Sequence, residues 1–194
     1  MLAAVILSGG ESQRMGSPKA LLRHHGKTFL EHLLAATAHP KVGVRRVVLG
    51  AHAQTISEAA SLPGDEIVIN SEWQKGPLSS LHAAMRSLPD GTDGILMCLV
   101  DHPLISSALV GRLIDTFYSS GRKIVLPTCG GRRGHPVIFS AELYQELLDA
   151  APELGARAVV WAHQQDIVEM VTEDRGCLVN INDPEAFADL RANP

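Results

Sequence analysis

The stretch LAAVILSGGESQRMGSPKALL, residues 2–22, joins a short apolar run to a loop that holds three glycines, an arginine and a lysine. The apolar run, residues 2–7, has no basic segment before it and is too short to cross a bilayer, so it is predicted to be a first strand and not a signal peptide. Ligands of open parallel sheets bind outside the carboxyl ends of the strands. A loop directly after a first strand is therefore the first place to expect a ligand.

Strand-like and helix-like segments alternate along the rest of the chain. Strands are predicted at 44–50, 65–70, 94–100, 123–127, 135–139 and 166–171, and helices at 28–38, 54–62, 78–88, 107–120, 141–164 and 184–192. This alternation implies crossover connections, and so a single-domain, three-layer α/β/α Rossmann-like fold with a mostly parallel sheet. Residues 94–100 lack polar alternation, as expected for a central strand. Residues 123–127 and 135–139 are joined by a Gly-rich turn too short for a crossover, which predicts an antiparallel excursion in the second half.

Composition excludes several classes of partner. The chain has 194 residues, 45% of them hydrophobic, and a formal charge of -4. It has no basic field of the kind that recruits nucleic acid or membrane surfaces, so neither is expected as a partner. Its three cysteines are far apart and never in CxxC spacing, which argues against a disulfide framework and indicates a reducing, cytoplasmic location.

The loop after the first strand matches neither GxGxxG nor GxxxxGK[ST], because its glycines are Gly9, Gly10 and Gly16. Glycines let backbone amides approach an anion closely, while Arg14 and Lys19 add permanent charge in two different shapes. The combination suits a polyphosphate. The plainer alternative is a solvated surface loop whose glycines only form turns.

A carboxylate ends the central apolar run in VDHPL, residues 100–104. Asp101 would lie at the same edge of the sheet as the cationic loop, where it can bind Mg²⁺, an ion that takes one or two carboxylates together with substrate phosphates. The alternative role is a cap for the next helix. Ser106 and Ser107 are better placed for that role.

These two elements, GGESQRMGSPKALL and DHP in this order, resemble the signature of the MobA-like nucleotidyltransferases, a family that attaches a nucleotide to molybdopterin. NSEWQKGPLSSL (70–81), GRRGHPVIF (131–139) and VNINDPEAF (179–187) resemble further segments of the same family, so nearly the whole chain fits its layout. GHPV and the Ser-Ser-Leu segment are most similar to the molybdenum cofactor cytidylyltransferases.

The resemblance implies Mg²⁺-dependent transfer of CMP from CTP to the phosphate of molybdopterin, with release of pyrophosphate. Residues 1–100 would then mainly bind the nucleotide and residues 101–194 mainly the acceptor, with a molybdoenzyme as a possible client. The catalytic candidates are Arg14, Lys19 and Asp101. The nucleotide-binding candidates are Leu7, Ser8, Gly9, Gly10, Gly16, Asn70, Gly76, Ser79 and Ser80, and the acceptor-binding candidates are Arg133 and His135. Asn70 as a strand-end turn residue, and the two arginines at 132 and 133 as an exposed turn, stay open as alternatives.

The closing segment departs from the cytidylyl pattern. Where those enzymes typically have a DIDTPE-like motif, this chain has NINDPE, with Asn180 and Asn182 in place of the acidic residues. An amide oxygen coordinates a hard cation without adding charge, so Asn182 is a weaker metal ligand than Asp101. Asp183 and Pro184 also fit a helix start.

Three alternatives therefore stay open for the function. NINTPE-like endings resemble the guanylyl branch, so GTP remains an alternative to the favoured CTP. A sugar- or polyol-phosphate nucleotidyltransferase shares the first motif. A non-catalytic nucleotide-binding chaperone for molybdoenzyme maturation would fit the neutral closing motif.

Overall fold

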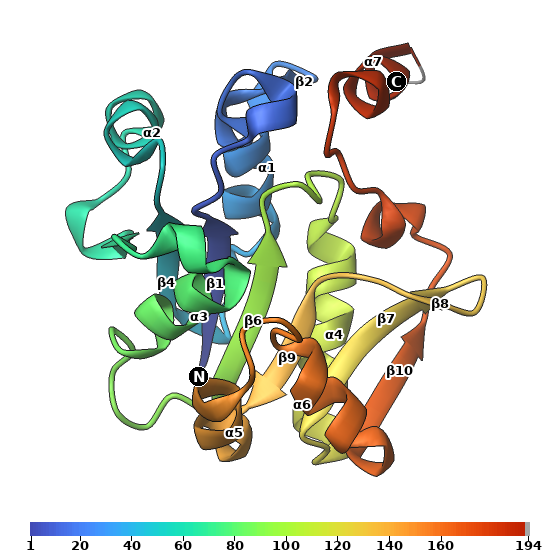
Figure 1. Cartoon of the computed structure of the whole chain (residues 1–194). Coiled ribbons are helices and arrows are strands. Elements are labelled where there is room, and N and C mark those ends of the chain that lie inside the picture. The colour runs from blue at the N-terminus through green and yellow to red at the C-terminus, as the bar shows by residue number, and fades with distance from the viewer. Residues whose placement is uncertain (193–194) are drawn as a thin grey trace.

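The computed structural model describes residues 1–192 and is built on one twisted sheet (Figure 1). The strand order is β10-β7-β9-β6-β1-β4-β5, with β8 paired to β7 off this path. The strands are β1 (Leu2–Ser8), β4 (Val42–Leu49), β5 (Ile67–Ile69), β6 (Gly94–Leu99), β7 (Ile124–Cys129), β8 (Arg132–Arg133), β9 (Val137–Ser140) and β10 (Ile167–Val171). A small hairpin of β2 (Arg23–His24) and β3 (Lys27–Thr28) lies apart from it.

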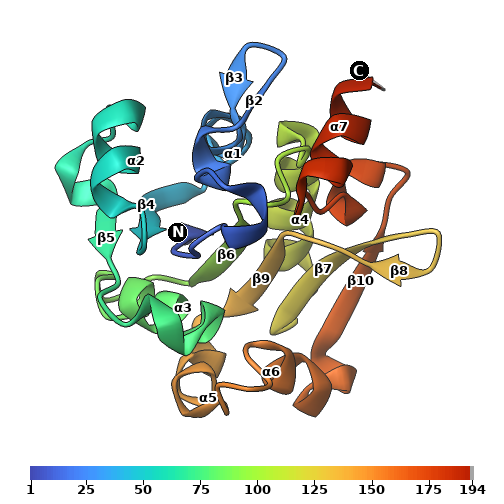
Figure 2. The same ribbon diagram turned by 45° about the horizontal axis from the view of Figure 1, so that its top comes forward.

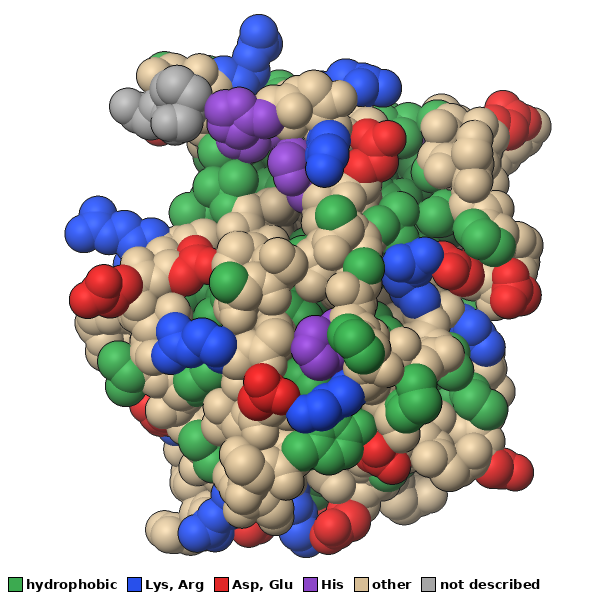
Figure 3. Space-filling model, turned by 180° about the vertical axis from the view of Figure 1, so that it is seen from behind, with side chains coloured by type: hydrophobic (Ala, Val, Ile, Leu, Met, Phe, Trp, Pro, Cys, Tyr) green, Lys and Arg blue, Asp and Glu red, His purple; other side chains and the backbone are tan. Residues whose placement is uncertain are grey.

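Helices cover both faces of the sheet, which confirms the predicted three-layer α/β/α fold (Figures 1 and 2). One layer and its core contain α1 (Phe29–Ala36), α2 (Ala53–Ala60), α4 (Ser107–Ser120) and α7 (Pro184–Ala192). The other contains α3 (Pro77–Met85), α5 (Tyr144–Asp149) and α6 (Arg157–Ala162). No helix within residues 1–192 has the length and apolar character needed to cross a membrane. On the face seen in Figure 3, basic and acidic side chains are interspersed.

The sheet is parallel except for the inserted strand β9 and the short β8, which pairs antiparallel with β7. β1 pairs in parallel with both β4 and β6, and all seven of its residues are buried, as expected for a strand covered on both faces. β9 lies between β6 and β7 and is antiparallel to both, with Ile138 opposite Leu96 on one side and Val125 on the other. The predicted antiparallel excursion is confirmed. The turn that precedes it lies at Gly130 and Gly131, whose positive φ values of 57° and 75° favour glycine.

The predicted helix over 141–164 is wrong as a single element. A one-turn helix at Ala141–Leu143 leads into α5, and a loop then separates α5 from α6. Pro152 lies in this loop and cannot continue a helix, and Gly155 adopts a left-handed φ of 63°. The helical pattern of apolar residues continues through the break, so periodicity alone does not reveal it.

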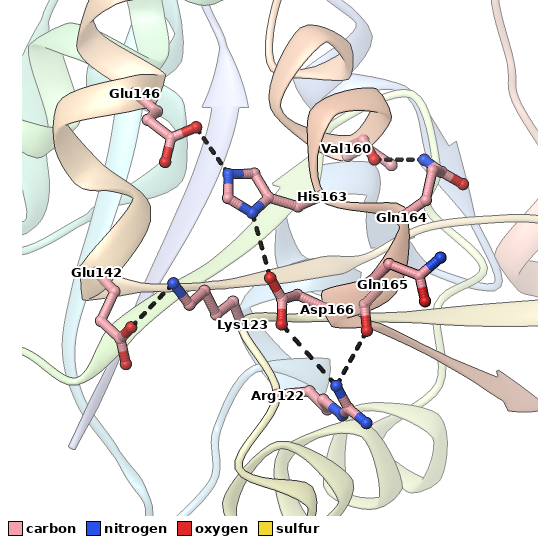
Figure 4. Close-up of polar contacts among 9 residues, drawn as sticks. All are labelled: Arg122, Lys123, Glu142, Glu146, Val160, His163, Gln164, Gln165 and Asp166. Atoms are coloured by element: carbon pink, nitrogen blue, oxygen red, sulfur yellow. Dashed lines mark hydrogen bonds and ion pairs between the residues drawn. The ribbon is translucent and has the colours of Figure 1, made fainter.

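The short helix α6 is fixed at its end by His163, whose ring lies between two carboxylates (Figure 4). Its Nε2 is 2.7 Å from Glu146 Oε2 of α5, and its Nδ1 is 3.3 Å from Asp166 Oδ2. Arg122 lies 3.9 Å from the other oxygen of Asp166. The hydrogen bond to Glu146, followed by that to Asp166, raises the pKa of His163 above its ordinary value.

This contact should make stability depend on pH. Because the pKa is raised in the folded chain, the protonated ring stabilises the fold fully below its unfolded pKa of about 6.5, and this contribution is lost as pH rises through the folded pKa. The two carboxylates are partly exposed, so we expect the free energy of unfolding to fall by about 0.2–1 kcal/mol as the ring loses its proton. In His163→Gln, the Tm from thermal unfolding between pH 5.5 and 8.5 should lack this pH-dependent stabilisation. His39→Gln, on the other face of the sheet, serves as control, and equal pH profiles for wild type and His163→Gln would contradict the assignment.

Candidate active site

A cleft of about 540 Å³ opens at the carboxyl ends of β1 and β6. The two strands are neighbours and parallel, so the loops that follow them meet at one edge of the sheet. Most of the lining comes from the first half of the chain, but Asp101 and Asn182 close it from the second. The lining residues are Leu7, Ser8, Gly9, Gly10, Glu11, Ser12, Gln13, Arg14, Pro18, Lys19, Ile56, Trp73, Gly76, Pro77, Ser80, Leu99, Val100, Asp101 and Asn182.

Lys19 is the centre of the polar contacts in this cleft. Its Nζ donates to Asn182 Oδ1 at 2.6 Å and lies 3.6 Å from Asp101 Oδ2. Burial lowers the pKa of Lys19, and the neighbouring Asp101 carboxylate only partly offsets this effect. The fold thus brings Lys19 together with two oxygen ligands that are distant in sequence. Asn182 is 163 positions from Lys19, and Asp101 is 82 positions from it.

Backbone contacts hold the segments that carry these side chains. The amide of Ile181 donates to the carbonyl of Asp101 at 2.7 Å, which places Asn182 beside the end of β6. Asp183 accepts a hydrogen bond from the amide of Ala186 at 2.9 Å, so the predicted helix start is confirmed. Ser106, rather than Asp101, caps α4 through the amide of Leu109. Asp101 is therefore free of a capping role.

A divalent metal would find two oxygen ligands here, the Asp101 carboxylate and the Asn182 amide. Across residues 1–192, no group of three or more His, Cys, Asp or Glu side chains could hold a metal ion. Donors of this kind and number suit Mg²⁺, which keeps several waters and relies on substrate phosphates for the rest of its coordination.

The loop after β1 folds into a compact cradle. Ser12 and Gly16, with left-handed φ values of 56° and 66°, flank a one-turn helix at Gln13–Met15. Ser12 Oγ accepts from the amide of Lys19 at 3.3 Å, which closes the loop onto itself. Gly16 does not line the cleft, so its part in this arrangement is the turn itself. Arg14 does line it.

Asn70 organises the opposite wall. Its Oδ1 accepts from the amide of Glu72 at 3.0 Å, so its Nδ2 faces the hydroxyls of Ser79 at 2.8 Å and Ser80 at 3.0 Å. Asn70 and Ser79 lie behind the wall, whereas Ser80 lines the cleft. A Cβ on Gly9 would lie 2.7 Å from Ser80 Oγ, so only glycine permits this close approach. The strand-end position of Asn70 is thus compatible with a supporting role at the site.

The two predicted acceptor residues lie in a second cavity. Arg133 and His135 line it, together with Leu7, Pro77 and Leu99, which also line the first cleft. The Arg133 guanidinium is held by Glu169 at 2.8 Å and Gln164 at 3.0 Å. Burial lowers the pKa of His135 to about 4, so its ring is neutral near pH 7.

Several lining residues escaped the sequence analysis, among them Glu11, Gln13, Ile56 and Trp73. Glu11 and Gln13 lie within the loop after β1, where the glycines and cations carry the recognisable pattern. Trp73 packs closely against Gly50, where an added Cβ would lie 2.6 Å from the Trp73 Cβ. The one signal for Trp73 in the sequence is its place three residues before Gly76, within the segment 70–81.

The fold and this cleft define a nucleotidyltransferase. The chain belongs to the MobA-like NTP transferase domain family, whose model matches residues 4–167. It is similar to nicotine blue oxidoreductase of Paenarthrobacter nicotinovorans, with 34% identity over 90% of each chain. It is also similar to molybdenum cofactor guanylyltransferase of Xanthomonas euvesicatoria pv. vesicatoria, with 29% identity over 96% of this chain and 92% of that one.

Solved structures share the fold. Rv0371c of Mycobacterium tuberculosis H37Rv superposes with a TM-score of 0.85 at 24% identity, over 99% of this chain and 97% of that one. Its complex with manganese superposes with a TM-score of 0.77 at 22% identity, over 100% and 99% of the two chains.

Proposed function

We propose that the protein transfers CMP from CTP to the phosphate of a molybdopterin-type acceptor, with Mg²⁺ as cofactor. The observation that carries this proposal is that Lys19 contacts both Asp101 and Asn182 in the cleft. An acceptor phosphate oxygen attacks the α-phosphorus, a new P–O bond forms, and the bond to the β-phosphate breaks. Pyrophosphate leaves with the electron pair, so the reaction needs no protein nucleophile.

The chain's own groups position the phosphates and balance their charge. Lys19 and Arg14 would bind the triphosphate and the departing pyrophosphate, and the amides of the loop after β1 would surround it. Asp101 and Asn182 would hold Mg²⁺, which supplies further charge neutralisation when bound. The manganese complex of Rv0371c supports a divalent ion in this fold. The three free cysteines are in keeping with a cytoplasmic location, and a molybdoenzyme client would receive the product.

Ser80 supports cytosine as the base. Its Oγ accepts from Asn70, and within the described chain its own proton has no acceptor, so this buried hydroxyl can donate into the cleft. The pairing edge of cytosine offers two acceptors, N3 and O2, whereas that of guanine is mainly donating. The guanylyltransferase relative supports GTP as the alternative.

Ser80→Ala should reduce the preference for CTP over GTP. A single hydrogen bond contributes about 0.5–1.5 kcal/mol, which corresponds to a roughly two- to tenfold change in selectivity. The measurement is the ratio of kcat/KM for the two triphosphates, from pyrophosphate release with a molybdopterin-type acceptor. Ser79→Ala, behind the wall, is the matched control. A wild-type protein that releases pyrophosphate faster from GTP would overturn the assignment of the base.

The relative named nicotine blue oxidoreductase favours a second candidate, a reductase that binds a nicotinamide dinucleotide in the same cleft. The absence of GxGxxG after β1 weighs against it. Oxidation of NADPH without pyrophosphate release would support the reductase. Nucleotide binding without either reaction would support the non-catalytic chaperone. Pyrophosphate release only with sugar or polyol phosphates would show that the acceptor is one of these and not a molybdopterin.

A further inference from the structure

The second cavity, of about 500 Å³, lies beside the nucleotide cleft and is mainly apolar. Leu7, Pro77 and Leu99 line both cavities, so a molecule in one can reach into the other without crossing the core. Much of its apolar lining comes from the sheet and α3, namely Leu78, Leu81, Met97, Leu126, Val137 and Phe139. A site of this size and character suits the ring system of a small molecule.

The outer wall of this cavity is α6, and it carries an aromatic ring beside a cation. Trp161 leaves 54% of its surface exposed, and the Arg157 guanidinium lies 5.7 Å from the centre of its ring. The two residues are one helical turn apart and both line the cavity. An indole face and a guanidinium plane are the surfaces on which flat rings stack.

The charged groups around this wall differ in whether an ion pair occupies them. Within the described chain Glu153 and Arg157 form no ion pair, although both line the cavity. His135 Nδ1 is buried without a hydrogen-bond partner. Arg133 differs, because Glu169 and Gln164 hold it. The apolar lining thus ends in a carboxylate and a cation that are available to a ligand.

The helix that carries this wall is held in place from behind. His163 ties its carboxyl end to Glu146 and Asp166, and Gln164 donates to the carbonyl of Val160 (Figure 4). The stacking surface is therefore part of a fixed helix. A rigid surface of this kind loses little conformational freedom when a ring stacks on it.

We propose that this cavity binds the flat heteroaromatic ring of the acceptor, stacked on Trp161 and Arg157. Glu153 accepts the N–H groups of an amino-pyrimidinone edge, an arrangement that a single carboxylate can satisfy with two hydrogen bonds. The side chain of the acceptor then extends past Leu7 and Leu99, and its phosphate reaches Lys19 and Asp101. This inference rests on the proposed function and assigns the ring-binding residues of its acceptor.

The two tryptophans of the chain separate the two sites, because Trp73 lines the first cleft and Trp161 the second. In Trp73→Phe, Trp161 is the only tryptophan, and neopterin monophosphate should quench its fluorescence with saturation. In Trp161→Phe, the fluorescence of the remaining Trp73 should respond to CTP with Mg²⁺. The same variant, titrated with the pterin, controls for light absorbed by the pterin itself. Absence of saturable quenching of Trp161 would overturn the inference.

Variants of the wall test the contacts themselves. In the Trp73→Phe background, Arg157→Gln and Glu153→Gln should each weaken pterin binding about tenfold, while Arg112→Gln on the other face of the sheet should leave it unchanged. Trp161→Ala in the otherwise native chain should raise the KM for the acceptor on the order of tenfold, as expected for one lost stacking contact, without changing kcat or the KM for CTP. Unchanged pterin affinity in both Gln variants would overturn the assignment.

The proposed function and this inference fail in different ways. If pterin quenches Trp161 but no pyrophosphate is released from CTP or GTP, the cavity assignment is supported and the transfer reaction is wrong. If pyrophosphate is released with the acceptor but Trp161→Ala leaves its KM unchanged, the transfer reaction is supported and the cavity assignment is wrong.

Discussion

Lys19→Ala should lower the rate of pyrophosphate release about 10²–10³-fold, the scale of losing one preorganised charge at a reacting centre. Lys19 is half-buried between Asp101 and Asn182, so under the proposed function its charge would act on the phosphates with little screening by water. Its removal also leaves the Asp101 carboxylate without its cation. The effect should fall on kcat, because charge develops on the leaving pyrophosphate in the transition state.

Asp101→Ala and Arg14→Ala should lower the rate by a similar order for different reasons. Asp101→Ala removes the charged ligand of the proposed metal site, so the loss of rate should be partly relieved by higher Mg²⁺. Arg14→Ala should not respond to metal in this way. The rates are measured by coupled detection of pyrophosphate, with Lys41→Ala, an exposed lysine paired to Asp115, as control. Full activity in all three cleft variants would contradict the mechanism.

Phe29→Ala should lower the free energy of unfolding by about 3–5 kcal/mol, since truncation of a fully buried aromatic removes packing and leaves a cavity. Phe29 begins α1, has no exposed surface, and its ring packs edge-on against Phe187 of α7 with centroids 5.8 Å apart. α7 directly follows the segment that carries Asn182. The substitution should therefore loosen the nucleotide cleft as well as the core.

Urea unfolding followed by far-UV circular dichroism measures this effect. Phe29→Leu, which keeps most of the apolar volume, should lose less than half as much stability. Below the unfolding transition, the remaining folded Phe29→Ala protein should bind CTP more weakly than Phe29→Leu does. Equal stability of the two variants would show that Phe29 does not join α1 to α7.

The sequence predicts most of this fold because its strands are short, apolar and separated by helical patterns. GILMCLV was recognisable as the central β6 since it has no polar alternation, and the short Gly-rich turn revealed the antiparallel β9. The segment 141–164 misled because amphipathic periodicity persists on both sides of Pro152. Local pattern does not show whether a proline interrupts one helix or separates two.

The site was less predictable where contacts are distant in sequence. Arg133 was an acceptor-binding candidate, and in the fold this β8 side chain pairs across β7 with Glu169 of β10, a partner that no motif indicates. Trp161 lies in α6, and no motif of the sequence indicates the cavity that it lines. A motif identifies residue types and their order, whereas the partners that occupy a side chain depend on the completed fold.

The hydrogen bond between Lys19 and Asn182 has a consequence for protein synthesis. A chain made at about 5–20 residues per second exposes Lys19 and Asp101 well before Asn182 has been added. Under the proposed function, a nascent chain of this length would have Lys19 and Asp101 but only one of the two oxygen ligands for metal. Productive capture of nucleotide would then begin only once Asn182 has been added and has met Lys19.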